Sequence, residues 1–284
     1  MGRIGRSWEL ISQSFAILNS DKELMLLPVA SAIACVALSV VLLSGGTLLF
    51  LPQLRALGRL QPHQPIPMSQ GMWAWLFLFY VLNYFVVIFF NVALVSIAEN
   101  RLVGGKATMN DGLQTAWKRT GVIFEWAVLA ATVGIVLRVL EDRMEWLGRF
   151  MMGLIGVAWT LASFFVVPIL AAEDIGPVEA LYRSAELFSQ TWGEQVAGGF
   201  SFGLIFLLLA LPGGLLPVLG VKLGPAGAAA GLGLAVIYWL LLSVVSSAAQ
   251  GIFMAALYRY ATTGEVSAGF TRDDLAGAWK PKDQ

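Results

Sequence analysis

The sequence predicts an all-α, polytopic membrane protein with six transmembrane helices. Its 284 residues are 58% hydrophobic and only 13% charged, which is too apolar for an ordinary soluble domain. Six apolar runs reach about the 20 residues that a helix needs to cross the hydrocarbon core of a bilayer. Because these runs are continuously apolar rather than alternating, we expect helices and not the strands of a barrel. A short motif before successive pairs of runs predicts three repeats.

The six runs differ in how clearly they predict a transmembrane helix. The first follows about 23 amphipathic residues and is too long for the core of a cleavable signal peptide, so we expect a retained signal anchor. The fifth contains Pro212 and Pro217, which leave open whether its helix is continuous or broken near Pro212. In chain order the runs cover approximately residues 24–51, 72–98, 122–140, 151–172, 196–219 and 226–257.

The repeated motif is a Leu or Ile, two residues, a small residue and usually Trp. Each of its first three copies precedes two apolar runs, so one repeat is predicted to be an amphipathic interfacial helix followed by a transmembrane hairpin. The copies are residues 4–8, 113–117, 181–185 and 275–279. A single membrane domain, 1–284, is expected, with pseudo-repeats at approximately 1–107, 108–175 and 176–265, and a cytoplasmic helix or tail at 266–284.

Two of the motif-bearing segments have the apolar spacing of an amphipathic helix, with steps of three and four residues. Such helices can lie in the headgroup plane with their tryptophans at the interface, or pack as cytoplasmic elbows on the bundle. The sequence leaves both arrangements open. The second repeat opens on Asn110-Asp111, a favourable helix cap. The apolar stripes are Ile4, Trp8, Ile11, Phe15 and Leu18 in the first repeat, and Val178, Leu181, Ala185, Phe188 and Trp192 in the third.

The distribution of charge predicts orientation and excludes some partners. With six spans, the face that holds both termini carries twelve Lys and Arg residues and the opposite face carries six. This asymmetry favours cytoplasmic termini in a multi-pass protein of the inner membrane. Since 18 basic residues balance 18 acidic ones, no overall field would attract nucleic acid. The single cysteine, Cys35, allows no intrachain disulfide.

One stretch of the third repeat carries a family resemblance. Residues 171–193 contain Glu173-Asp174, then Leu181-x-Arg183-Ser184, and resemble the signature of an uncharacterised prokaryotic six-span family. They also resemble the membrane domain fused to some glycerophosphodiester phosphodiesterases. Glu99-Asn100 is similar to a weaker copy of Glu173-Asp174. Because the sequence shows no soluble phosphodiesterase domain, the resemblance implies fold and membrane location and no catalytic residue.

We expect no enzyme, no cofactor and no metal site. The single histidine, His63, stands among prolines in the first external loop, a setting more typical of a solvated residue than of a ligand. Residues 199–203 match the Gly-x-Ser-x-Gly pattern of lipases but lie inside an apolar run with no strand before them, so close helix packing is the better interpretation. An enzymatic reading would require His63 or the Glu173-Asp174 pair to meet a cavity.

Polar residues in and beside the spans are the remaining site candidates. Those within spans could line a hydrated path or hold a lipid headgroup, although hydrogen bonding between helices is the interpretation we favour. They are Asn83, Asn91, Ser243, Ser247 and Gln250. Near the outer end of the third span, Arg138 can pair with Glu141 or Asp142. A cytoplasmic polar cluster, including an i,i+4 pair of Glu179 and Arg183, is predicted from Glu173, Asp174, Glu179 and Arg183.

Together these features predict a non-enzymatic integral membrane module that binds membrane lipid or a partner protein. The alternative is a transporter or channel for a small solute or lipid, which hydration around Asn83, Asn91 and Gln250 would favour. Small-residue faces leave open whether the chain forms a homo-oligomer.

Overall fold

The computed structural model describes residues 22–57, 69–144, 146–192, 202–222 and 224–267, and no strand occurs among them. The predicted all-α class is therefore confirmed for the described residues. The N-terminal stripe, His63, the fourth motif copy and residues 199–201 of the lipase-like pattern lie outside them. The elements are η1 (Lys22–Met25), α2 (Leu26–Leu49), α3 (Leu51–Leu57), α4 (Gln70–Leu102), α5 (Met109–Lys118), α6 (Thr120–Arg143), α7 (Trp146–Ala162), α8 (Val166–Ala172), α9 (Pro177–Trp192), α10 (Phe202–Val221) and α11 (Gly224–Thr263).

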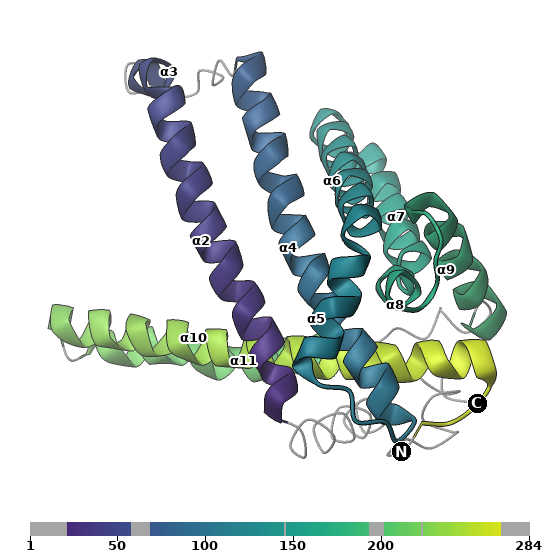
Figure 1. Cartoon of the computed structure of the whole chain (residues 1–284). Coiled ribbons are helices and arrows are strands. Elements are labelled where there is room, and N and C mark those ends of the chain that lie inside the picture. Colours follow the sequence, from purple (N-terminus) through teal and green to yellow (C-terminus); the bar gives the residue numbers. More distant parts are fainter. Residues whose placement is uncertain (1–21, 58–68, 145, 193–201, 223, 268–284) are drawn as a thin grey trace.

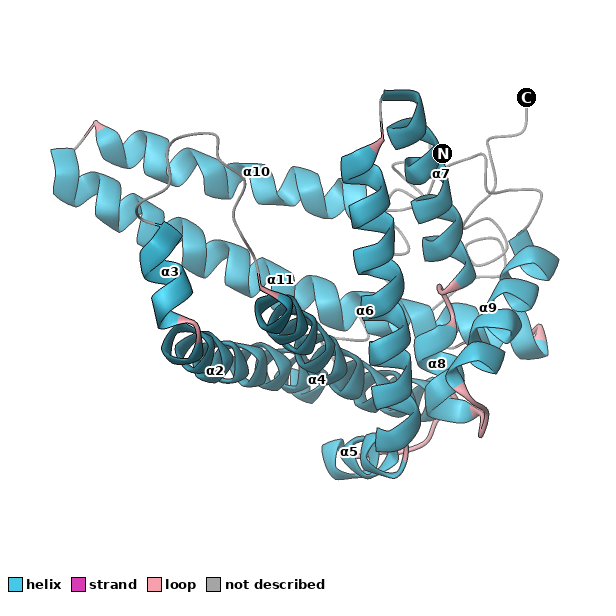
Figure 2. Ribbon diagram, turned by 90° about the horizontal axis from the view of Figure 1, so that it is seen from above, coloured by secondary structure: helices cyan, strands magenta, loops and turns pink. Residues whose placement is uncertain are grey.

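Three pairs of long helices extend in three different directions from one shared end of the helical bundle, which we call the base. The pairs are α2 with α4, α6 with α7, and α10 with α11. In Figure 1, α10 and α11 run crosswise to α2 and α4. In Figure 2, α6 and α7 are seen lengthwise and run crosswise to α10 and α11. The shorter helices α5, α8 and α9 pack around the base.

The hydrophobic core lies at this base, where parts of all three pairs meet. Its fully buried members come from η1, α2, α4, α5, α6, α8, α9 and α11, and from the turn before α8. Gly251 of α11 allows a close approach to α4, because a Cβ at this position would overlap the Leu94 side chain. The opposite end of each long helix is its far end. Core residues include Val92, Leu94, Ile97, Ile123, Phe165, Ile169, Ala180, Leu187, Ile252 and Leu257.

Away from the base the long helices expose apolar side chains that a water-soluble protein would bury. Five helical segments are long and apolar enough to cross a membrane. This combination indicates a membrane protein. The candidate spans are Glu23–Leu49, Gln70–Leu102, Thr120–Glu141, Gly148–Ala172 and Gly224–Thr263. Exposed apolar residues include Val36, Val40, Leu48, Leu211, Leu215, Val218, Leu234, Ile237 and Leu241.

The structure differs from the six predicted runs in three places. The fourth run is divided into α7 and α8 by a turn at residues 163–165. The fifth run forms a helix that is continuous through Pro212 and Pro217, but its described apolar part, Phe206–Val221, is too short to count as a span by itself. The sixth extends to a helix of 40 residues because its second half is a core element of the base. Five candidate spans, not six, are therefore found among the described residues.

Helices α5 and α9 carry the second and third copies of the motif. The small residue of each copy, Ala116 or Ser184, is fully buried. Trp117 is 74% exposed and rests edge-on against Phe89, an arrangement suited to an indole at a membrane interface. The α5 cap begins two residues earlier than the predicted Asn110, because Thr108 is the N-cap of a capping box.

Candidate functional site

Asn83, the first of the predicted intramembrane residues, joins α2 to α4. Its side-chain nitrogen donates to the Phe79 carbonyl at 2.9 Å, and its side-chain oxygen accepts from the Ser39 hydroxyl at 3.1 Å. Both ends of the amide therefore have partners inside the protein. This is the interhelical hydrogen bonding that the sequence favoured for this residue.

The other predicted polar residues of the spans do not gather with Asn83. The Ser243 hydroxyl donates to the Leu240 carbonyl of its own helix, and the Gln250 amide donates to Ser246 Oγ at 3.0 Å. Asn91 and Ser247 are half-buried. Within the described part of the chain, no hydrogen bond joins the predicted polar residues of α4 to those of α11. These five residues therefore do not form a continuous polar path in the structure.

The predicted cytoplasmic cluster is partly assembled at the base. Glu173, the residue that ends α8, accepts a hydrogen bond from the Tyr258 hydroxyl at 2.8 Å. Arg183 Nε lies 3.6 Å from the same carboxylate oxygen, and its Nη1 lies 3.3 Å from a Glu186 oxygen. Arg183 therefore pairs with Glu173 and Glu186. Its predicted i,i+4 partner Glu179 is exposed and forms no salt bridge with it. These bonds tie α8, α9 and α11 together.

Asp174 points to a different element from its neighbour Glu173. It forms a salt bridge with Arg119, the residue between α5 and α6. On the other side of the cluster, Glu99 near the end of α4 has one carboxylate oxygen that is buried and accepts no hydrogen bond from the described residues. The resemblance to Glu173-Asp174 pointed to Glu99, but no pattern in the sequence pointed to Tyr258 or Arg119.

The bonded residues at the base, which we call the base cluster, have the pairing of a network that stabilises the fold. They are Arg119, Glu173, Asp174, Arg183, Glu186 and Tyr258. The carboxylates of the cluster pair with arginines or a tyrosine hydroxyl, and among the described residues no three His, Cys, Asp or Glu side chains are grouped so that they could hold a metal ion. Removing one partner from such a network is costly where the remaining group is buried, because it loses solvation without regaining a bond. The cluster therefore fixes how the second and third helical pairs meet.

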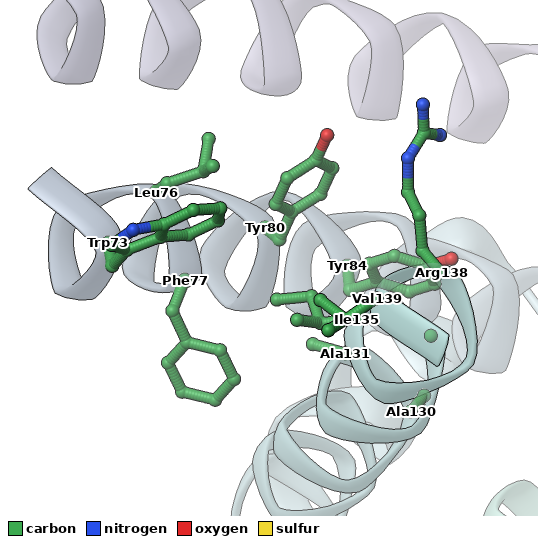
Figure 3. Close-up of a pocket in the computed structure, with 11 residues that line it drawn as sticks. Trp73, Leu76, Phe77, Tyr80, Tyr84, Ala130, Ala131, Ile135, Arg138 and Val139 are labelled. Atoms are coloured by element: carbon green, nitrogen blue, oxygen red, sulfur yellow. The ribbon is translucent and has the colours of Figure 1, made fainter. Parts of the chain in front are cut away.

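A groove of about 550 Å³ lies between α4 and α6, away from the base. It closes toward the base, where Phe85 and Phe124 meet edge-to-face with ring centroids 6.0 Å apart. Its volume is within the range of about 300–1,000 Å³ that is typical of small-molecule sites. Figure 3 shows its walls. The lining residues are Trp73, Leu76, Phe77, Tyr80, Tyr84, Ala130, Ala131, Gly134, Ile135, Arg138 and Val139.

The two walls of the groove have different chemistry. The α4 wall is an aromatic stripe at steps of four, three and four residues: Trp73, Phe77, Tyr80 and Tyr84. The α6 wall is dominated by small residues, which leave space in front of the rings. Trp73, Tyr80 and Tyr84 are 51%, 45% and 46% exposed, so the groove is open at the side of the two helices.

Arg138 is the only charged residue among the described residues that line the groove. It lies three residues before the end of the candidate span Thr120–Glu141. Of its two predicted partners, Glu141 forms no ion pair with it, and the Asp142 side chain lies outside what the structure describes. In Figure 3 the Arg138 guanidinium and the Tyr80 hydroxyl extend in the same direction. No residue of this groove except Arg138 was predicted from the sequence, although the aromatic stripe of α4 was a signal that could have indicated it.

A second hollow, of about 330 Å³, lies between α2 and α4 and is lined by no charged residue. The Trp75 indole donates to the Leu42 carbonyl at 3.1 Å and rests on Gly46, where a Cβ would lie 2.6 Å from the indole nitrogen. Here the tryptophan serves helix packing, and no cation is available to orient a ligand.

Comparison with known proteins gives one family match that covers both the groove and the base cluster. A family model described as a family of unknown function (DUF6159) matches residues 71–270. The chain belongs to this family. The match to DUF6159 runs from the start of α4 to just beyond α11, so it includes both walls of the groove and the whole base cluster. This agrees with the predicted uncharacterised family, whereas the resemblance to phosphodiesterase-fused domains stays a prediction. Searches of curated proteins and of solved structures found no match.

Proposed function

We propose that the chain is a non-enzymatic integral membrane module that binds a lipid in the groove between α4 and α6. The observation that carries this proposal is an aromatic groove that opens sideways between two candidate membrane spans. A lateral opening at this position is reached from the bilayer and not from water. Aromatic and aliphatic walls suit an acyl chain, and one charged side chain at the far end suits a headgroup.

The topology that we propose has six spans, three repeats and both termini in the cytoplasm of an inner-membrane protein. Three helical pairs and the equivalent burial of Ala116 and Ser184 support the repeats. The excess of Lys and Arg on the face of the termini supports the orientation. This topology requires the three helical pairs, which run crosswise to one another in the structure, to align in the bilayer. The base then lies at the cytoplasmic face, α5 and α9 are interfacial, and Arg138 lies at the outer leaflet.

We prefer lipid binding to transport because the polar residues of the spans already have local partners. The oxygen and the nitrogen of the Asn83 amide both form hydrogen bonds, to a residue of α2 and to a carbonyl of α4. The Gln250 amide donates to a serine on its own helix. Transport of an ion or polar solute usually needs polar groups that converge on one path. A partner protein is the alternative ligand, and the exposed apolar faces of α10 and α11 are the surface that would bind it.

The test is native mass spectrometry of protein extracted into polymer-bounded lipid discs, without detergent. Gly134 lines the groove and a Cβ there meets no atom within 4 Å, so Gly134→Leu fills the groove without displacing the backbone. Gly153 of α7 is equally open and lies outside the groove, so Gly153→Leu is the matched control. The wild type and Gly153→Leu should retain about one lipid per chain, and Gly134→Leu should lose it. Equal lipid retention by the two variants would contradict the proposal.

A further inference from the structure

We propose that the lipid in the α4–α6 groove is a phospholipid of net negative charge whose phosphate is bound by Arg138. This inference rests on the proposed function and names the class of ligand. The described structure contains an apolar groove with a single guanidinium at one end, and the chemistry of both parts matches one amphipathic anion.

The charge of the lining selects an anion. Among the described residues that line the groove, Arg138 is the only one with a charged side chain, and none is a carboxylate. A guanidinium binds phosphate through two parallel hydrogen bonds, a geometry that a lysine could not reproduce. A zwitterionic lipid would bring an ammonium group that finds no acidic partner in the groove. A net anionic headgroup, such as a phosphatidylglycerol, therefore complements the site better.

The position of Arg138 along α6 fits the depth of a headgroup. It lies 18 residues after Thr120, which is about 27 Å along a helix with a rise of 1.5 Å per residue. A hydrocarbon core is about 30 Å thick, so the guanidinium can reach the interface on the side away from the base. In Figure 3 the Tyr80 hydroxyl, from the middle of the aromatic stripe, extends in the same direction as the Arg138 guanidinium.

The rest of the groove suits an acyl chain. From Arg138 toward the base, the α6 wall continues as Ile135, Gly134 and Ala131, none of which carries a polar side chain. Tyr84 supplies the facing ring on α4. The lining residues end toward the base at Tyr84, Ala130 and Ala131, and the Phe85–Phe124 ring contact lies beyond them. The arrangement is polar at one end and apolar along its length, as a phospholipid is.

The experiment measures which lipid the protein keeps in discs made from equal amounts of phosphatidylglycerol and phosphatidylethanolamine. Native mass spectrometry gives the ratio of the two bound lipids for each variant. The wild type should favour phosphatidylglycerol, and Arg138→Gln should lower that preference by about ten-fold or more, as expected when a charge-assisted hydrogen bond is lost. Arg143→Gln is the control, because Arg143 is exposed on the last turn of the same helix and does not line the groove. Its lipid ratio should equal that of the wild type.

The outcomes separate this inference from the proposed function. If Gly134→Leu loses lipid but Arg138→Gln keeps the wild-type preference, the groove binds lipid and Arg138 does not select it. An equal loss of preference in Arg138→Gln and Arg143→Gln would also overturn the inference, because general surface charge would then account for the effect. If Gly134→Leu keeps its lipid, the proposed function itself fails. Unchanged thermal unfolding midpoints would establish that each variant is folded.

Discussion

The buried hydroxyl of Ser184 should stabilise the fold through one hydrogen bond. Ser184 is fully buried on α9, and its Oγ accepts from the backbone N–H of Phe165 at 2.8 Å. Phe165 is also fully buried and stands directly before α8, where a helix has backbone N–H groups without intrahelical partners. The bond therefore joins two elements that are 19 residues apart in sequence and gives the motif's small residue a second role besides close packing.

Replacing Ser184 by Ala removes the acceptor and leaves the Phe165 N–H buried. An unsatisfied buried donor costs about 1–3 kcal/mol, which corresponds to a five-fold to more than hundred-fold change in the unfolding equilibrium constant. The free energy of unfolding can be measured by denaturant titration in detergent micelles with tryptophan fluorescence as the readout. Amide hydrogen exchange at Phe165 should also accelerate, since local opening exposes this N–H first.

Ser189→Ala on the same helix is the matched control. Its hydroxyl is exposed and donates to the Glu186 carbonyl at 2.9 Å, so its loss should change the free energy of unfolding by less than about 0.5 kcal/mol. The reasoning would be refuted if Ser184→Ala were as stable as Ser189→Ala and the exchange rate at Phe165 were unchanged.

Further predictions follow from the packing and capping of the shorter helices. Gly112→Ala should lower the free energy of unfolding by about 1–3 kcal/mol, because its Cβ would lie 2.6 Å from a backbone oxygen of α4; denaturant titration should show no such loss for Gly121→Ala, where nothing lies within 4 Å. Tyr258→Phe should cost about 1 kcal/mol in the same assay through the lost bond to α8. Hydrogen bonds from Thr108 lower the pKa of Asp111, so the α5 cap is intact above the ordinary carboxyl pKa and is lost as pH falls through the lowered value. Amide exchange at the start of α5 should rise in that acid range.

The sequence was sufficient to predict where most long helices lie, because an apolar run of about 20 residues has few alternatives to a helix in a bilayer. It could not predict the turn at residues 163–165. The run is apolar on both sides of this turn, and the bond that fixes it comes from Ser184 in another helix. The length of α11 was also missed, since apolar residues that face a protein core and those that face lipid look alike in sequence.

The candidate site was harder to predict than the fold. Glu173 and Arg183 were identified from local patterns, but their shared partner Tyr258 lies 85 residues after Glu173. Similarly, the groove depends on the divergence of α4 from α6 beyond the Phe85–Phe124 contact, which no local pattern encodes. Aromatic and small residues at helical spacing predict helix packing equally well, and only the spatial arrangement distinguishes a filled interface from an open one.

An experimental structure of the wild-type protein in a lipid mesophase would test the central claim most directly. Our account predicts elongated density between α4 and α6, with its polar end beside the Arg138 guanidinium and its apolar part along Ile135 and Tyr84. A map in which the side chains of α4 and α6 close on each other, with no space for a lipid between them, would contradict it.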